Sequence, residues 1–346
     1  MNSPAQSANA SEPAIARWLF VSAALAFLMV VVGGVTRLTH SGLSIAEWQP
    51  LIGALPPLSD ADWQQLFAKY RETPEFRLVN FDMDLAGFKD IFWWEYFHRL
   101  LGRLIGIVYA LPFAWFLLNR RLDRSLAWKL GGVLVLGALQ GAMGWYMVKS
   151  GLVDNPRVSH FRLTAHLGLA LAIIAAELWI AFGLLAPRRA GPLAPAARHA
   201  LALSALVFLM CLTGGFVAGL RAGYAYNSFP LMNGHLVPPE IMMLDPWWSN
   251  FLYNMATVQF VHRAIAWLLI VLIPAFWWFA PRVMPSGRSR LATHVLLAVL
   301  ALQVALGIAT LLLVVPTVLA AAHQGGAVLL LAAALWAAHE HATEPA

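Results

Sequence analysis

Eight runs of about twenty apolar residues limit what this chain can fold into. A helix of about 20 apolar residues spans the hydrocarbon core of a bilayer and satisfies its own backbone hydrogen bonds there. Charged residues make up 12% of the 346 residues, about half of the ~25% usual in soluble domains. The composition therefore excludes a soluble globular enzyme, a disordered protein and a nucleic-acid-binding protein. We predict an all-α integral membrane protein with eight transmembrane helices, at residues 17–36, 91–118, 126–148, 161–186, 200–220, 255–280, 291–314 and 317–338.

The basic residues predict the orientation of these spans. Lys and Arg gather between spans two and three, four and five, and six and seven, and cytoplasmic loops carry such an excess. Both termini are therefore expected in the cytoplasm, and the segments 37–90 and 221–254 are expected outside. The net charge of +6 is interpreted as a record of this topology. The basic residues concerned are Arg120, Arg121, Arg124, Lys129, Arg188, Arg189, Arg198, Arg282, Arg288 and Arg290.

Short motifs in the first four spans recur in the same order in the last four, about 160 residues later, which indicates an internal repeat. Phe97-His98-Arg99 is similar to Val261-His262-Arg263, and Ala165-His166-Leu167-Gly168 to Ala322-His323-Gln324-Gly325. We predict two duplicated four-helix bundles with the same membrane orientation. The first is expected to comprise residues 1–186, with the long outer loop 37–90, and the second residues 187–346.

Four histidines occupy equivalent depths in the even-numbered spans: His98, His166, His262 and His323. A lone membrane histidine can simply form a hydrogen bond between helices, but four at equivalent places favour metal ligation. Imidazole ligates haem iron, and bundle cores hold cofactors between facing helices. We predict one haem site in each half, formed by His98 with His166 and by His262 with His323; pairing across the halves is the alternative. The other histidines, His339 and His341 among them, are expected at surfaces.

The two halves differ beside these histidines. Glu95 precedes His98 by one helical turn, whereas Gln259 occupies the equivalent place before His262. Glu95 is expected to deliver protons or stabilise positive charge, with an interfacial charge as the alternative. The first half is therefore predicted to perform chemistry and the second to transfer electrons. Arg37 and Arg221 are expected to bind haem propionates, or to reach the membrane interface as ordinary snorkelling side chains.

The ordered set of motifs resembles the haem A synthase family over nearly the whole chain. The resemblance implies that haem O is oxidised to haem A, its C8 methyl becoming a formyl group by successive hydroxylations. It implies that His262 and His323 ligate a haem b cofactor, that His98 and His166 serve the substrate haem, and that Glu95 is required. The motifs are Gly33-Gly34-Val35-Thr36-Arg37-Leu38-Thr39, Ser41-Gly42-Leu43-Ser44, Trp48, Glu95-Tyr96-Phe97-His98-Arg99, Gly102-Arg103, His160-Phe161-Arg162, the run from Tyr226 to Gly234, Gln259-Phe260-Val261-His262-Arg263 and His323-Gln324-Gly325.

The outer segment 37–90 contains no cysteine; the single cysteine is Cys211. The chain thus resembles the cysteine-free branch of proteobacteria and mitochondria, which implies a bacterial inner membrane and excludes thiol chemistry in that segment. Haem O synthase, cytochrome oxidase assembly factors, membrane lipid and an electron donor of unspecified identity are the expected partners. A homo-oligomer is possible, because Gly102-x-x-x-Gly106 permits close helix contact.

Two other functions fit the same four histidines. The chain can be a non-catalytic di-haem cytochrome b, an electron-transfer subunit, or a haem transporter or chaperone with exchangeable ligands. Glu95 and the long outer segment favour the synthase. The haem extracted from the purified protein distinguishes the three, since haem O or haem A beside haem b is expected only of the synthase.

Overall fold

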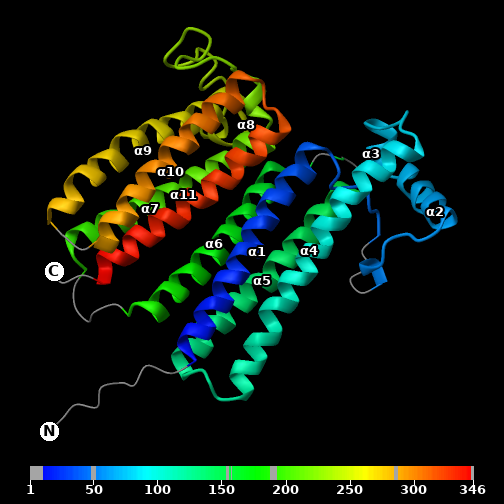
Figure 1. Ribbon diagram of the computed structural model, residues 1–346. Helices are drawn as coiled ribbons and strands as arrows, with labels where there is room; N and C mark the ends of the chain where they lie inside the picture. Colours follow the sequence, from blue (N-terminus) through cyan, green and yellow to red (C-terminus); the bar gives the residue numbers. More distant parts are fainter. Residues whose placement is uncertain are drawn as a thin grey trace.

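The computed structural model describes residues 11–47, 52–152, 156, 158–187, 193–283 and 287–343. Within these residues eight helices are long and apolar enough to cross a membrane, as predicted, so the chain is a multi-pass membrane protein (Figure 1). Trp48, Arg188 and Arg189 lie outside the described residues. The eight helices are α1 (Glu12–Leu38), α4 (Leu85–Leu118), α5 (Arg124–Gly151), α6 (His160–Leu185), α7 (Pro195–Gly219), α9 (Met255–Val283), α10 (Gly287–Leu312) and α11 (Thr317–Thr343).

Several of these helices extend beyond the predicted spans. Helix α4 begins at Leu85 and not at residue 91, because the Asp84 side chain accepts a hydrogen bond from Gly87 N and caps it there. Helix α11 continues to Thr343, and His339 and His341 in its last turns are buried. The expectation that these two histidines lie at a surface was wrong. Hydropathy marks only the part of a helix that lipid surrounds, whereas caps and packing decide where it ends.

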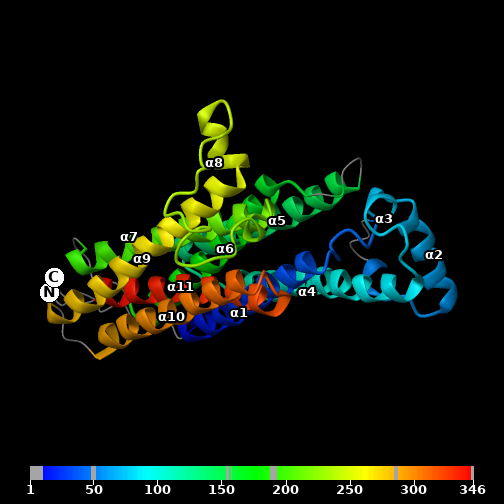
Figure 2. The same cartoon turned by 90° about the horizontal axis from the view of Figure 1, so that it is seen from above.

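The helices pack in a regular order of neighbours. Helix α1 contacts α4 and α6, and α5 contacts the same two; α7 contacts α9 and α11, and α10 contacts the same two. Helix α6 contacts α7 and α11, and α1 contacts α11, so the first and last long helices lie side by side (Figures 1 and 2). Across this contact the Gln324 side-chain amide donates to Val30 O at 2.8 Å. The largest apolar core lies at this junction and includes Val30, Leu171, Val207 and Leu331.

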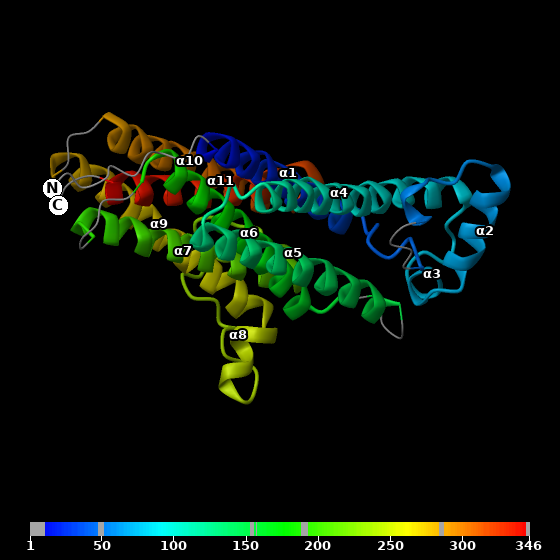
Figure 3. The ribbon, with the colours of Figure 1, turned by 90° about the horizontal axis from the view of Figure 1, so that it is seen from below.

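The segment between α1 and α4 folds on the N-terminal part of α4. It contains η1 (Ile52–Ala54), α2 (Asp60–Arg71) and α3 (Pro74–Leu78), which lie beyond the helical bundle (Figure 3). Ser59 and Asp62 form a capping box at the start of α2. A buried aromatic cluster holds the segment against α4; it comprises Trp63, Tyr70, Phe88, Ile91, Phe92 and Tyr96. We call residues 52–84 the outer domain.

The segment between α7 and α9 contains η2 (Ala222–Tyr224), η3 (Trp247–Ser249) and α8 (Asn250–Tyr253). It projects sideways from the bundle in Figure 2. The Asn250 side chain fixes this loop through hydrogen bonds with Leu244 and Trp247 O. Asn254 accepts hydrogen bonds from two backbone amides at the start of α9. Side-chain hydrogen bonds of Asn250 and Asn254 thus hold this segment where it lacks regular structure.

Candidate functional site

The four predicted histidines lie on four different helices, and the structure brings them together in two pairs. His98 of α4 interacts electrostatically with His166 of α6, and His262 of α9 interacts with His323 of α11. These are the pairs within each half that the sequence predicts, and not pairs across the halves. The ligand roles of the histidines remain predictions.

Each histidine faces a glycine on a neighbouring helix. A methyl group at Gly307 would lie 2.8 Å from His323 Cε1, which is closer than van der Waals contact allows. The other three glycines are less tight, because there a methyl group would require the ring to shift by a few tenths of an ångström. Their distances from a methyl group to the ring are 3.2 Å for Gly33 and His98 Nε2, 3.3 Å for Gly144 and His166 Cε1, and 3.3 Å for Gly214 and His262 Cε1.

Polar groups beside the rings are only partly paired. Thr213 Oγ1 lies 2.9 Å from His262 Nδ1, and Gln140 Nε2 lies 3.4 Å from His166 Nε2. The Nδ1 atoms of His166 and His323 are buried and have no hydrogen-bond partner. Because buried polar atoms are nearly always paired, such imidazole nitrogens indicate a ligand.

The donor set fits haem better than zinc. The described residues contain no group of three or more His, Cys, Asp or Glu side chains that could hold a metal ion. Zinc sites need three or four protein ligands, whereas haem iron takes four nitrogens from the porphyrin and needs one or two from the protein. Two histidines with a glycine beside each ring therefore suit haem in both halves.

Glu95 is buried, with 2% of its surface exposed, and it fastens the start of the outer segment to α4. Its Oε2 accepts hydrogen bonds from Ser44 Oγ at 2.7 Å and Ile45 N at 2.8 Å. Its Oε1 accepts from Arg99 Nε at 3.0 Å and Arg99 Nη2 at 2.6 Å. Four donors, two of them on a guanidinium, thus satisfy both oxygens of this buried side chain. The sequence analysis did not predict this anchoring role; the signal available was the arginine one turn after Glu95.

The second half has an uncharged anchor at the equivalent place. Gln259 Nε2 donates to Tyr226 O at 3.2 Å. Arg263 donates to the same carbonyl at 2.9 Å and to Ser228 O at 3.0 Å. Both positions thus attach a loop to a helix, but only Glu95 supplies a group that can carry a proton.

Arg37 and Arg221 lie together at the C-terminal ends of α1 and α7, close enough to interact electrostatically. Arg37 donates a hydrogen bond to Ala218 O, and Arg221 Nη2 lies 3.5 Å from His40 Nδ1. Two neighbouring guanidinium groups repel each other unless an anion lies between them. This placement fits the predicted binding of a haem propionate.

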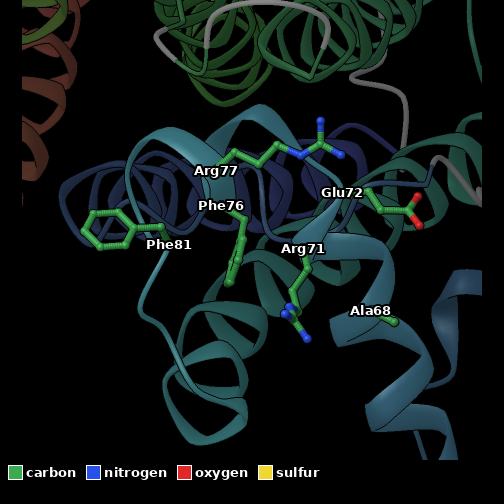
Figure 4. A pocket seen from close by; sticks show the side chains of 6 residues that line it. All are labelled: Ala68, Arg71, Glu72, Phe76, Arg77 and Phe81. Carbon is green, nitrogen blue, oxygen red and sulfur yellow. The ribbon is translucent and has the colours of Figure 1, made fainter.

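A separate surface hollow of about 460 Å³ lies on the outer domain (Figure 4) and contains none of the predicted site residues. Arg71 in this hollow lies over the rings of Phe67 and Phe76. Its charge therefore takes part in packing the outer domain. The hollow is lined by Ala68, Arg71, Glu72, Phe76, Arg77 and Phe81.

Comparison with known proteins points to one family. Residues 16–335 match the family described as Cytochrome oxidase assembly protein. A Heme A synthase of Nitrosospira multiformis is 62% identical, over 94% of this chain and 93% of that protein. Two more proteins of that name, from Nitrosomonas eutropha and Paramagnetospirillum magneticum, are 56% and 47% identical over 93% and 96% of this chain. These two alignments cover 92% and 95% of the relatives.

Proposed function

Because this chain belongs to the haem A synthase family, we propose that it is an enzyme that oxidises the C8 methyl group of haem O to the formyl group of haem A. The observation that carries the proposal is the presence of two half-buried histidine pairs, each ring facing a glycine. Two haem sites are what the reaction needs, one for the substrate and one for an electron-transfer cofactor.

The two sites have different tasks in this proposal. Residues 1–186 bind haem O, and residues 187–346 hold a haem b cofactor between His262 and His323. The matching order of helix neighbours in the two halves supports their origin by duplication. The hydrogen bonds that attach a loop to Glu95 in one half and to Gln259 in the other support the same origin. Haem b, when bound, supplies one-electron transfer.

The residues of the first half position the substrate and take up and release protons. His98 and His166 would bind or flank the iron of haem O, and one of them would dissociate, or never bind, during turnover, since two bound histidines would block access of an oxidant. The Glu95 carboxylate takes up and releases protons beside this site. The guanidinium groups of Arg37 and Arg221 bind propionates between the two halves.

Expression in a bacterial host that supplies haem O but lacks its own synthase tests the function. We expect haem A to appear among the extracted haems. Extraction of haem b alone, with haem O unchanged, would instead favour a non-catalytic di-haem cytochrome b or a haem carrier.

The location proposed is the bacterial inner membrane, with both termini in the cytoplasm. An even number of crossings places the two ends of the described chain on the same side. The outer domain and the loop containing α8 then face outward. Haem O synthase and cytochrome oxidase assembly factors are the proposed partners, beside an electron donor. Reporter fusions to the chain ends and to the outer domain test this topology.

A further inference from the structure

The hydroxyl group of Thr213 in α7 links its own helix to a histidine of the second pair. Its Oγ1 atom lies 2.9 Å from Nδ1 of His262 in α9. The same hydroxyl donates to Met210 O at 2.8 Å, one turn earlier in α7, and the Met210 sulfur lies 3.9 Å away. Thr213 therefore contacts the imidazole ring directly, and the function proposed above gives this contact no role.

These contacts decide which ring nitrogen carries the proton. A threonine hydroxyl has a single proton to donate, and a carbonyl oxygen can only accept, so this proton goes to Met210 O. Thr213 Oγ1 must then accept a hydrogen bond from the ring, which means that His262 Nδ1 carries the imidazole proton. An imidazole that ligates iron is neutral. Its other nitrogen, Nε2, is therefore left with a free lone pair.

The backbone of α7 limits the position of the same ring. A methyl group at Gly214 would lie 3.3 Å from Cε1 and 3.9 Å from Nδ1 of His262. Thr213 and Gly214 are consecutive residues, and together they contact the Nδ1–Cε1 edge of the ring. The hydrogen bond thus occupies Nδ1 and leaves Nε2 as the nitrogen that can bind iron.

The first half has no hydroxyl at the equivalent place. There the glycine that faces His98 is Gly33, and the residue before it is Val32. Valine has no group that can accept a hydrogen bond from an imidazole. The difference between Val32 and Thr213 suits the two tasks proposed for the halves, a ligand that leaves during turnover in one and a permanent ligand in the other.

We propose that Thr213 is the positioning residue that makes His262 a permanent ligand of the haem b iron through Nε2. The inference rests on the proposed function, which gives this cofactor to His262. Thr213 contacts the ring and not the iron. By accepting from Nδ1–H it fixes the tautomer and the orientation of the ring. It also makes the imidazole a stronger electron donor, which favours the oxidised iron and lowers its reduction potential.

The reduction potential of resident haem b tests this role without turnover. Thr213→Val removes the hydrogen-bond acceptor, so a spectroelectrochemical titration of the purified full-length protein should give a higher potential than in the wild type. Loss of a group that orients a metal ligand typically costs about 10–100-fold in metal affinity. We therefore expect haem b to bind about tenfold more weakly or worse, measured by titrating the haem-depleted protein with haem b.

Three further variants complete the experiment. Thr213→Ser keeps the hydroxyl and should keep both the potential and the affinity of the wild type. Thr213→Ala lacks the hydroxyl and should repeat the shifts of Thr213→Val, including where the valine variant fails to fold. Ser204→Ala is the matched control, because Ser204 lies in the same helix and its hydroxyl donates to Ala200 O at 2.8 Å. It should change neither quantity.

A wild-type potential in Thr213→Val and Thr213→Ala would overturn the proposal. So would a shift in Thr213→Ser as large as that in Thr213→Val, or an equal shift in Ser204→Ala. Failure of the proposed function looks different. If the chain carried haem without oxidising it, the wild-type protein would form no haem A, while Thr213→Val would still shift the haem b potential.

Discussion

The contact between Gly307 and His323 makes a quantitative prediction for haem binding. In Gly307→Ala the new methyl group would lie 2.8 Å from His323 Cε1, against about 3.5–4.0 Å for an ordinary carbon contact. The ring must therefore move by roughly 1 Å. Metal–ligand distances tolerate only about 0.2 Å, so the moved ring is a poorer ligand.

Overpacking of this kind costs about 1–3 kcal/mol, while alanine gains about 1 kcal/mol over glycine in a helix. The midpoint of these values gives a net loss of about 1 kcal/mol, which lowers haem b affinity about fivefold. Absorption spectra of the purified variant, titrated with haem b, measure this affinity.

Gly141→Ala is the matched control, because Gly141 lies in α5 with nothing within 4 Å of its added methyl group. It should bind haem b as the wild type does and be slightly more stable. If Gly307→Ala bound haem b normally, or if Gly141→Ala lost as much affinity, the glycine would not be a determinant of the site.

Three further predictions follow from the same geometry. His262→Ala and His323→Ala should each lose resident haem b, measured by haem extraction; an unchanged haem b spectrum would contradict the proposed division between the halves. Glu95→Gln should retain haem but convert haem O about 10²-fold more slowly or worse, measured as haem A formed per enzyme, and full turnover would remove Glu95 from the mechanism. Burial raises the pKa of Glu75 from 4.5 to about 8 on folding, so between these pH values the folded state binds more protons than the unfolded state and loses stability as the pH rises. Proteolysis of the outer domain should therefore speed up from pH 6 to 9. The Glu75→Gln variant should lose this pH dependence.

Sequence reasoning predicts the membrane part of this fold well, because hydrocarbon imposes one simple requirement on each span. It fails at the ends of the helices. The six residues of α4 before residue 91 are held by the Asp84 cap and by the aromatic cluster around Phe88, and neither follows from hydropathy. His339 and His341 were expected at a surface for the same reason.

The sequence predicts the histidine pairs of the candidate site because their motifs recur in both halves of the chain. His98 and His262 stand in similar motifs, and the structure pairs each with the partner expected for it. The glycine against each ring, the anchoring of Ser44 by Glu95 and the burial of Glu75 depend on segments that are distant in sequence. Apart from the arginine one turn after Glu95, a single sequence contains no signal for such contacts, because they arise only when helices pack.

The contact between α1 and α11 has a consequence for assembly at the ribosome. Of the eight spans, α1 enters the membrane before the others and can pack on α4 and α6 as these emerge, whereas α11 follows all of them. Until α11 is made, one flank of α1 faces lipid, and the carbonyl of Val30 lacks the amide of Gln324 as its donor. The junction of the two halves therefore closes only after α11 has been inserted. A nascent chain that stalls before α11 would expose this unfinished flank to membrane quality-control proteases.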